Sequence, residues 1–461
     1  MRNILRFLPW LAVLIASAAA AAPARPNVLF IAVDDLRVSL GCYGDPLTLT
    51  PNLDRFAAGA RVFNRAYTLQ AVCGPARTAM LTGRLPDHNR SWHNRNLFRA
   101  TNPDSVTLPQ LFMQHGYFTQ AMGKIFSGDE RELDPASWSV PEILRQDGWR
   151  NYALPRGEAP GKQAPWEAAD VPDEGYSDGK LAALAVETLG RLKAEAKPFF
   201  LAVGFHRPHL PLVAPAKYFD LYPFDSIQLP TEPADDEADI PAPARNGSVP
   251  GYALTTTPDQ RRAAIRGYLA TVSYMDAQAG RVLDALKRLK LEENTIVIFA
   301  ADHGWHLGEH GLWHKRSLFE ESARVPFLVA APGAKGNGQR SASLVELLDV
   351  YPTLCDLAGV PAPAGLQGKS LRPVLNNPLA SFHEGAFTQA RRGAKAEHWG
   401  RSVRTARWRC TEWDEGRNGI ELYDHAADPH EFTNLANDPK HATVLKELRA
   451  LLAAKLPPIA K

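Results

Sequence analysis

Val28-Leu29-Phe30-Ile31-Ala32-Val33-Asp34-Asp35 is the stretch that decides the fold class of this chain. Its first six residues are all apolar, which is typical of a strand covered on both faces of a parallel sheet. The two aspartates that follow lie at the strand end, where two adjacent carboxylates are costly unless a cation neutralises them. The stretch therefore predicts a buried strand that ends at a cation site.

Apolar runs of the same kind recur along the chain, separated by amphipathic stretches. The runs cover residues 199–205, followed by His206, residues 295–300, followed closely by Asp302 and His303, and residues 325–330. The amphipathic stretches run from Ser177 to Glu195, with Ser177 or Asp178 as the N-cap, and from Thr257 to Leu289. Strands that alternate with helices predict an α/β fold with a mainly parallel sheet sandwiched by helices.

Polar residues follow several of these predicted strands. Open parallel sheets bind ligands beyond the carboxyl ends of their strands, so we expect one shared edge for Asp34, Asp35, His206, Asp302 and His303. Aspartate oxygens suit Ca²⁺ or Mg²⁺, and a strand-end histidine is a candidate acid or base. A zinc hydrolase is the competing interpretation, but the chain has no H-E-x-x-H motif and its histidines follow no zinc-ligand spacing.

The last part of the chain has a different pattern. Its predicted elements are a strand from Ser402 to Trp413, a short strand over Glu421-Leu422-Tyr423-Asp424 and a helix from Thr443 to Leu456. They predict a smaller C-terminal α+β subdomain over residues 374–461, after a main domain over residues 23–373. Residues 220–260, rich in Pro, Asp and Glu, are expected to form a surface excursion.

The N-terminus is typical of a secretory signal peptide. Positively charged residues precede an apolar run and a stretch of small residues, which predicts a signal peptide over residues 1–22. No later segment is long enough to cross a membrane. Among 461 residues, 52 Lys and Arg balance 50 Asp and Glu, with no basic block. We expect a periplasmic or secreted protein with no nucleic-acid partner and no integral membrane segment after signal removal.

A cysteine opens the run Cys73-Gly74-Pro75-Ala76-Arg77-Thr78-Ala79-Met80-Leu81-Thr82-Gly83-Arg84, which reads C-x-P-x-R followed by T-G-R. Alone, Cys73 could be a buried free thiol before a helix, with Pro75 in the first turn, where its missing N–H costs nothing. The arginines and the T-G-R at set positions argue for a chemical role. Lys315, which follows Asp302 and His303, could supply positive charge to an anionic oxygen.

Together these motifs resemble the type I sulfatases of the alkaline phosphatase superfamily, most closely the iduronate-2-sulfatase branch. The similarity covers nearly the whole mature chain. It is carried by residues 27–37, 40–45, 73–84, 122–126, 204–209, 302–315 and 421–435. The resemblance implies an alkaline phosphatase-like fold, with a catalytic sulfatase domain over residues 23–373.

The resemblance also implies two cofactors. Cys73 would be oxidised to formylglycine, an aldehyde, by a formylglycine-generating or anaerobic maturation enzyme. Ca²⁺ would be held by Asp34, Asp35, Asp302 and His303, with an oxygen of the modified Cys73 as a further ligand. The hydrated aldehyde carries two hydroxyls on one carbon, of which one would attack sulfur and the other would later expel sulfate.

Roles for the remaining site residues follow from the same resemblance. Arg77 and Lys124 would stabilise the aldehyde hydrate and the sulfate, Lys315 would bind a sulfate oxygen, and His206 would act near the leaving oxygen, as a general acid. Trp305 and Arg95 are candidate substrate contacts. The expected activity is hydrolysis of sulfate esters on a sulfated carbohydrate.

One position departs from the branch. A histidine is expected three residues after Lys124, where Ser127 stands, and a serine is no base at neutral pH. His306 and His310 are candidates to replace it. The alternatives that remain open are a phosphatase or phosphonate hydrolase on the same scaffold, and an inactive glycan-binding relative.

Overall fold

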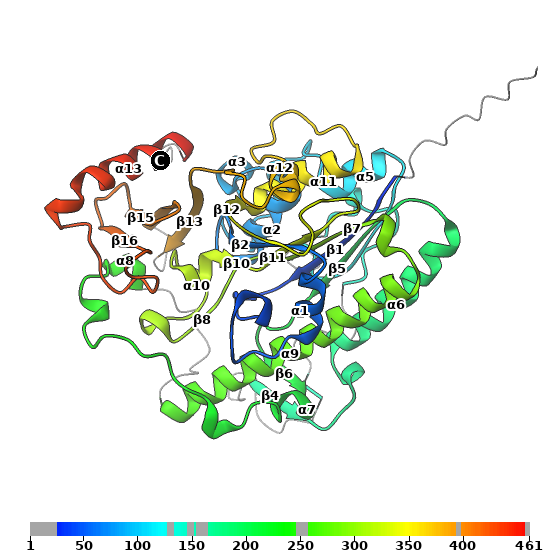
Figure 1. Cartoon of the computed structure of the whole chain (residues 1–461), viewed down its shortest axis with the longest axis horizontal. Coiled ribbons are helices and arrows are strands. Elements are labelled where there is room, and N and C mark those ends of the chain that lie inside the picture. The colour runs from blue at the N-terminus through cyan, green and yellow to red at the C-terminus, as the bar shows by residue number, and fades with distance from the viewer. Residues whose placement is uncertain are drawn as a thin grey trace, which may run out of the picture.

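The computed structural model describes residues 25–126, 133–144, 152–153, 165–245, 257–392 and 398–456. The predicted signal peptide and Ser127 lie outside these residues. An eight-stranded sheet runs through the centre of the molecule in the order β10-β2-β11-β7-β1-β5-β3, with β12 paired to β2 (Figure 1). Its strands are β1 (Asn27–Val33), β2 (Arg61–Tyr67), β3 (Phe118–Gly123), β5 (Phe199–Phe205), β7 (Thr295–Ala301), β10 (Arg324–Val325), β11 (Phe327–Ala330) and β12 (Arg340–Glu346).

Most neighbours in this sheet run parallel, as predicted. β7, β1, β5 and β3 form one continuous parallel block. The run at residues 325–330 differs from expectation, because Pro326 separates β10 from β11 and β11 pairs antiparallel with β7. Proline offers no backbone N–H to a sheet ladder, so a strand is interrupted where it occurs.

Helices cover both faces of the sheet. In Figure 1, α6 and α9 lie together on one side, while α2, α5 and α11 lie on the other. The helices are α1 (Pro51–Ala57), α2 (Cys73–Thr82), α3 (Pro86–Asn89), α4 (Phe98–Thr101), α5 (Leu108–Gln114), α6 (Ser177–Glu195), α7 (Ala216–Phe219), α8 (Ala242–Arg245), α9 (Pro258–Arg288), α10 (Glu320–Ala323), α11 (Val350–Ala358), α12 (Arg372–Asn376) and α13 (Ala442–Lys455).

The two long predicted helices are confirmed as α6 and α9. Thr257 caps α9 through a capping box with Gln260. The N-cap of α6 is Tyr176, not Ser177 or Asp178. Asp178 does not cap this helix because its carboxylate accepts the backbone N–H groups of His206 and Arg207 instead.

The C-terminal part forms a separate antiparallel sheet in the order β13-β14-β15-β16, with α13 packed against it. Its strands are β13 (Ala386–Arg392), β14 (His398–Arg404), β15 (Trp408–Trp413) and β16 (Ile420–Asp424). The predicted single strand from Ser402 to Trp413 is wrong, because the chain turns at residues 405–407 and pairs β14 with β15. The α+β subdomain itself is confirmed, while α12 spans the boundary predicted at residue 374.

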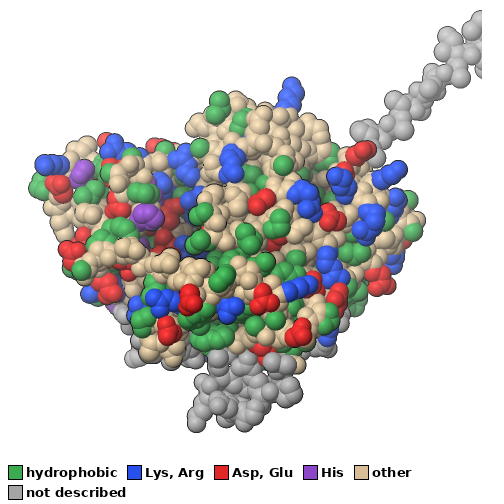
Figure 2. Space-filling model, turned by 60° about the horizontal axis from the view of Figure 1, so that its bottom comes forward, with side chains coloured by type: hydrophobic (Ala, Val, Ile, Leu, Met, Phe, Trp, Pro, Cys, Tyr) green, Lys and Arg blue, Asp and Glu red, His purple; other side chains and the backbone are tan. Residues whose placement is uncertain are grey.

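Two smaller sheets complete the described structure: β4 (Trp166–Ala169) with β6 (Leu212–Pro215), and β8 (His306–Leu307) with β9 (Trp313–His314). Acidic and basic side chains are interspersed over the face shown in Figure 2. Within the described ranges, no helix has both the length and the apolar character that crossing a membrane requires.

Candidate active site

Four neighbouring parallel strands end at the residues that the sequence singled out. β7 is followed by Asp302, β1 by Asp34, β5 by His206 and β3 by Lys124. Parallel strands place their carboxyl ends at one edge, so these residues converge although they lie far apart in the chain. Asp34, Asp35, Asp302 and His303 are all essentially inaccessible to solvent.

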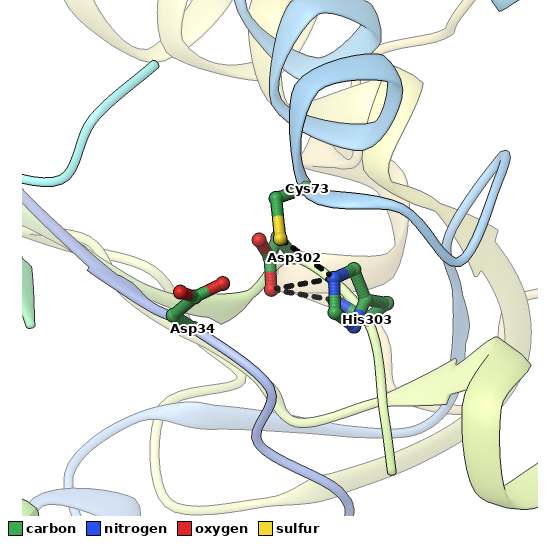
Figure 3. Close-up of side chains that lie close together, drawn as sticks. All are labelled: Asp34, Cys73, Asp302 and His303. Atoms are coloured by element: carbon green, nitrogen blue, oxygen red, sulfur yellow. Dashed lines mark hydrogen bonds and ion pairs between the residues drawn. The ribbon is translucent and has the colours of Figure 1, made fainter. Parts of the chain in front are cut away.

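Helix α2 carries Cys73 to the same edge. Cys73 is the first residue of the helix and is fully buried, where free backbone N–H groups and the helix dipole favour negative charge. Its Sγ lies 3.3 Å from His303 Nε2 and 3.2 Å from Lys315 Nζ. Figure 3 shows the thiol aimed at Asp302 and His303, with Asp34 beside them.

The guanidinium of Arg77, one turn further along α2, ties this helix to two strand ends. Its Nε donates to Asp302 Oδ2 at 2.7 Å, and its Nη2 lies 3.8 Å from Asp34 Oδ1. Nη1 donates to the carbonyls of Lys124 and Ile125. Arg77 therefore holds helix α2, which carries Cys73, in place against the carboxylates.

Two buried lysines pair with the two adjacent aspartates. Lys124 Nζ lies 2.5 Å from Asp34 Oδ2, and Lys315 Nζ lies 2.5 Å from Asp35 Oδ1. Burial alone would raise the pKa of Asp34, but Lys124 and the other nearby cations hold it well below its usual value. Burial raises the pKa of Asp35 above its usual value, although Lys315 opposes the rise.

A glycine on the neighbouring strand positions Lys124. The Lys124 N–H donates to the carbonyl of Gly204 at 2.9 Å. A Cβ on Gly204 would lie 2.0 Å from the Lys124 carbonyl oxygen, so any larger residue would push this backbone apart. Gly204 therefore permits the close approach that aims Lys124 at Asp34.

The carboxylates offer a site that fits Ca²⁺. Asp34 Oδ1 and Asp35 Oδ2 are buried and accept no hydrogen bond from any described residue. One possible ligand atom from each of Asp34, Asp302, His303 and Cys73 lies within 4.8 Å of the others. Hard carboxylate oxygens with unsatisfied lone pairs suit Ca²⁺.

The charges around this site are balanced before a cation binds. Three buried carboxylates (Asp34, Asp35 and Asp302) face three buried cations (Arg77, Lys124 and Lys315). A divalent cation would leave the site with a net positive charge. Such a site attracts an anionic group such as a sulfate ester.

The two histidines that follow β5, His206 and His209, contact different carboxylates. The Nδ1 of His206 lies 3.7 Å from Asp178 Oδ1. His209, which the sequence analysis did not select, brings its Nε2 to 4.0 Å from Asp34 Oδ2 and 3.9 Å from Asp35 Oδ2. Both histidines lie in the segment Gly204-Phe205-His206-Arg207-Pro208-His209. The apolar run of the strand ends before them, so the sequence could not predict which way each imidazole ring points.

The two candidate substrate contacts lie in different surroundings. Trp305 is only 3% exposed and stacks on His314, with a ring-centroid distance of 4.9 Å, and Lys315 Nζ lies 5.6 Å from its ring centroid. The Lys315 ammonium therefore makes a cation–π contact with this ring, and substrate contact by Trp305 stays a prediction. Arg95 is exposed and follows Asn94, whose Oδ1 accepts the N–H of Gly74 at 2.8 Å.

The histidines expected to replace the base missing at Ser127 contact other residues. His306 Nε2 lies 2.5 Å from Ser317 Oγ, and His310 Nδ1 lies 3.0 Å from Asp236 Oδ2. Burial lowers the pKa of His306 to about 3. The pKa of His310 rises to about 9, against the effect of burial, because its partners are carboxylates. Among the described residues, Cys73 Sγ contacts His303 and Lys315 and neither of these two rings.

Comparison with known proteins places this chain in a protein family. Residues 26–360 match the family described as Sulfatase, and residues 308–456 match the one described as N-sulphoglucosamine sulphohydrolase, C-terminal. The iduronate 2-sulfatase of Mus musculus is 33% identical over 92% of this chain and 93% of its own length.

Two solved structures extend the comparison. One, in complex with its substrate D-glucosamine-2-N,6-O-disulfate, is 25% identical with a TM-score of 0.77, covering 94% of this chain and 99% of that chain. The phosphonate monoester hydrolase of Silicibacter pomeroyi is 25% identical with a TM-score of 0.80, and the match covers 94% of this chain and 96% of that chain. Because the family match runs from β1 to the end of α11 and beyond it, and an iduronate 2-sulfatase aligns over nearly its whole length, this chain belongs to the sulfatase family and is a sulfatase by enzyme class.

Proposed function

We propose that this enzyme hydrolyses sulfate esters on a sulfated glycan, using formylglycine derived from Cys73 and a Ca²⁺ ion held by Asp34, Asp35, Asp302 and His303. One observation carries the proposal. Cys73 Sγ is buried within 3.3 Å of His303 Nε2 and 3.2 Å of Lys315 Nζ, beside a carboxylate cluster. An inert buried thiol would be expected among apolar side chains instead.

Formylglycine would supply the nucleophile, and Ca²⁺ would supply part of the positive charge. As its hydrate, formylglycine would supply one hydroxyl as the nucleophile toward sulfur and a second hydroxyl for the later release of sulfate. Bound Ca²⁺ would offset negative charge on the sulfate oxygens. Lys315 lies 3.2 Å from Cys73 Sγ and Lys124 pairs with Asp34, and both lysines would bind sulfate oxygens as charge develops on them. Arg77 keeps α2 and Asp302 aligned.

The geometry favours His209 over His206 as the residue that handles the proton of the leaving oxygen. His209 Nδ1 lies 2.6 Å from the Leu210 carbonyl, to which only a protonated Nδ1 can donate. Its Nε2 therefore faces Asp34 and Asp35 with a lone pair. To act as the acid, His209 would first have to take up a proton at Nε2, and it would then pass that proton to the departing sugar oxygen.

The substrate class and location rest on the relatives and the N-terminus. A related enzyme is named for iduronate sulfate, and a similar structure holds a disulfated glucosamine. The signal-like residues 1–22 support a periplasmic or secreted enzyme that meets extracellular glycans. A formylglycine-generating or anaerobic enzyme would have to modify Cys73. We assign catalysis to residues 23–373 and a supporting role to residues 374–461.

A second candidate function is hydrolysis of phosphonate or phosphate esters. The similarity to the phosphonate monoester hydrolase of Silicibacter pomeroyi favours it. The same buried cations would bind either tetrahedral anion. A sulfate monoester and a phosphonate monoester each carry one negative charge, whereas a phosphate monoester can carry two. Comparison of substrates is therefore needed to separate the two candidates.

The test combines one mass measurement with substrate turnover. The peptide spanning Cys73 is analysed by mass spectrometry after expression with a maturation enzyme. Release of sulfate is measured from an aryl sulfate and from sulfated oligosaccharides, alongside a phosphonate monoester. Aldehyde together with sulfate release is the expected result, and chelation should remove activity that added Ca²⁺ restores. An unmodified thiol in a fully active enzyme would overturn the formylglycine proposal, and activity on the phosphonate alone would favour the second candidate.

A further inference from the structure

The second aspartate after β1 has an uncommon backbone conformation. Asp35 has a φ of +58°, in the left-handed region that residues with a side chain seldom adopt. The residue is also fully buried. An uncommon conformation persists only where the surrounding structure fixes it, so specific contacts must hold Asp35 in this turn.

The left-handed turn allows two adjacent aspartates to face the same place. In an extended strand, successive side chains point to opposite faces of the sheet. Here Asp34 Oδ2 and Asp35 Oδ2 lie 4.0 Å and 3.9 Å from the same atom, Nε2 of His209. The backbone at Asp35 therefore leaves the strand conformation at the point where both carboxylates are needed for one cation.

A buried hydroxyl holds both sides of this turn. Tyr268, in α9, donates its hydroxyl proton to the carbonyl oxygen of Asp35 at 2.8 Å. The same hydroxyl oxygen accepts the backbone N–H of Arg37 at 2.9 Å. A tyrosine hydroxyl has a single proton, so its donor is used entirely on Asp35. The two hydrogen bonds tie the backbone on either side of residue 36 to a long helix.

The ring of Tyr268 is itself fixed by packing. It is inaccessible to solvent and stacks on Trp305, with a ring-centroid distance of 6.3 Å and an angle of 15° between the ring planes. Lys315 Nζ lies 5.6 Å from the Trp305 ring centroid and 2.5 Å from Asp35 Oδ1. These contacts form a closed circuit that begins and ends at Asp35. A ring packed in this way holds its hydroxyl at a fixed point.

The turn leaves one carboxylate oxygen of Asp35 available to a cation. Lys315 pairs with Oδ1, and the backbone N–H of Asp35 donates to Asp302 Oδ1 at 3.3 Å. Oδ2 is buried and accepts no hydrogen bond from any described residue. Burial of such an oxygen is costly unless a cation binds it, and carboxylate oxygens suit Ca²⁺.

We propose that Tyr268 is a positioning residue for Ca²⁺ binding, whose hydroxyl holds the left-handed turn that brings Asp35 beside Asp34. Tyr268 would act only through the backbone, because both of its hydroxyl hydrogen bonds go to backbone groups of this turn. The inference rests on the proposed function, since it takes Asp35 as a ligand of Ca²⁺. Without the hydroxyl, the turn would populate commoner backbone conformations in which the carboxylate leaves the site. The apparent Ca²⁺ affinity falls in proportion to the population that can bind.

The test is the substitution Tyr268→Phe, which removes the hydroxyl and keeps the ring. Titration calorimetry measures the Kd of Ca²⁺ for the full chain, expressed with a maturation enzyme and freed of metal by a chelator. We expect the substitution to raise this Kd about tenfold or more. Sulfate release from an aryl sulfate should then need about tenfold more Ca²⁺ to reach half its maximal rate. The kcat at saturating Ca²⁺ should stay within about threefold of the unchanged chain, because bound Ca²⁺ selects the left-handed turn.

Tyr274→Phe is the matched control, because Tyr274 lies in the same helix and its hydroxyl has the same kinds of partner. It accepts the N–H of Gly179 at 2.6 Å and donates to the carbonyl of Asp173 at 2.9 Å. Both variants lose a buried hydroxyl and should lose similar stability, but Tyr274→Phe should change the Kd of Ca²⁺ less than about twofold. Thermal midpoints over a range of Ca²⁺ concentrations give the same comparison for a variant too unstable for calorimetry.

An unchanged Kd in Tyr268→Phe, or an equal rise in both variants, would overturn the role of Tyr268. A lower kcat at every Ca²⁺ concentration, with an unchanged Kd, would also overturn it. These outcomes leave the proposed function intact. The proposed metal site fails separately, and the inference with it, if the unchanged chain binds no Ca²⁺ in the same titration. The sulfatase proposal fails if the unchanged chain, with its aldehyde and Ca²⁺ present, releases sulfate from no substrate.

Discussion

Lys315 Nζ lies 3.2 Å from Cys73 Sγ, although 242 positions separate the two residues. The same ammonium lies 2.5 Å from Asp35 Oδ1. One cation therefore bridges the expected nucleophile and the expected metal site. This position suits a group that binds a sulfate oxygen while the nucleophile attacks.

Lys315→Gln should lower kcat/KM for sulfate release by about 100-fold or more, because a neutral amide cannot offset charge that develops in the transition state. The measurement is sulfate release from an aryl sulfate at saturating Ca²⁺. The exposed Lys217, which pairs with Asp173 at the surface, provides the matched variant Lys217→Gln. An effect of equal size in both variants would contradict the role assigned to Lys315.

Cys73→Ala should abolish turnover, with a loss of at least about 10⁴-fold, while the fold remains intact. Circular dichroism and the thermal midpoint report on the fold. Cys355→Ala is the matched control, because Cys355 is an equally buried thiol in α11. It should cost stability through a small cavity but leave the activity per folded molecule unchanged. Full activity of the Cys73 variant would exclude a mechanism through this residue.

His209→Asn should slow a sugar sulfate much more than a nitrophenyl sulfate. A sugar oxygen needs a proton to leave and a nitrophenolate does not, so we expect about 100-fold loss on the first and less than about 10-fold on the second. His206→Asn should affect both substrates equally, because this ring lies against Asp178. The reverse pattern would restore His206 as the acid.

Asp236→Asn should destabilise the protein at neutral and acid pH but less in alkali. The pKa of His310 is raised to about 9 in the folded state, because its hydrogen bond to Asp236 and the charge of Glu321 outweigh burial. The unfolded value is about 6.5, so this pair stabilises the fold fully below that pH and less as the pH rises through 9.

Denaturant unfolding at several pH values checks the effect. The variant should lose about 1–2 kcal/mol at pH 6, and the difference from the unchanged chain should shrink by pH 9.5. Glu232 and Glu431 also face His310 and remain in both proteins. A difference that is constant between pH 6 and 9.5 would mean that the His310 charge does not contribute.

Local patterns in the sequence predicted much of the main sheet. The apolar runs that form β1, β5 and β7 are long and uniform. Such runs are typical of strands that are buried on both faces of a sheet. Asp34, Asp302 and His303 then followed directly from where these runs end. By contrast, the turn between β14 and β15 went unseen, because Thr405-Ala406-Arg407 contains no glycine, proline or asparagine to mark it.

Which side chains meet was decided by tertiary structure alone. The cysteine motif and the strand-end carboxylates are readable in the sequence because each is a short contiguous pattern. Whether His206 or His209 faces the carboxylates depends on the path of the backbone after β5 and on Asp178 in α6. Likewise, the bridge between Gln70 and Gln389 forms only because β13 packs beside the segment before Cys73. Contacts between distant segments arise from tertiary packing, which a local sequence pattern does not encode.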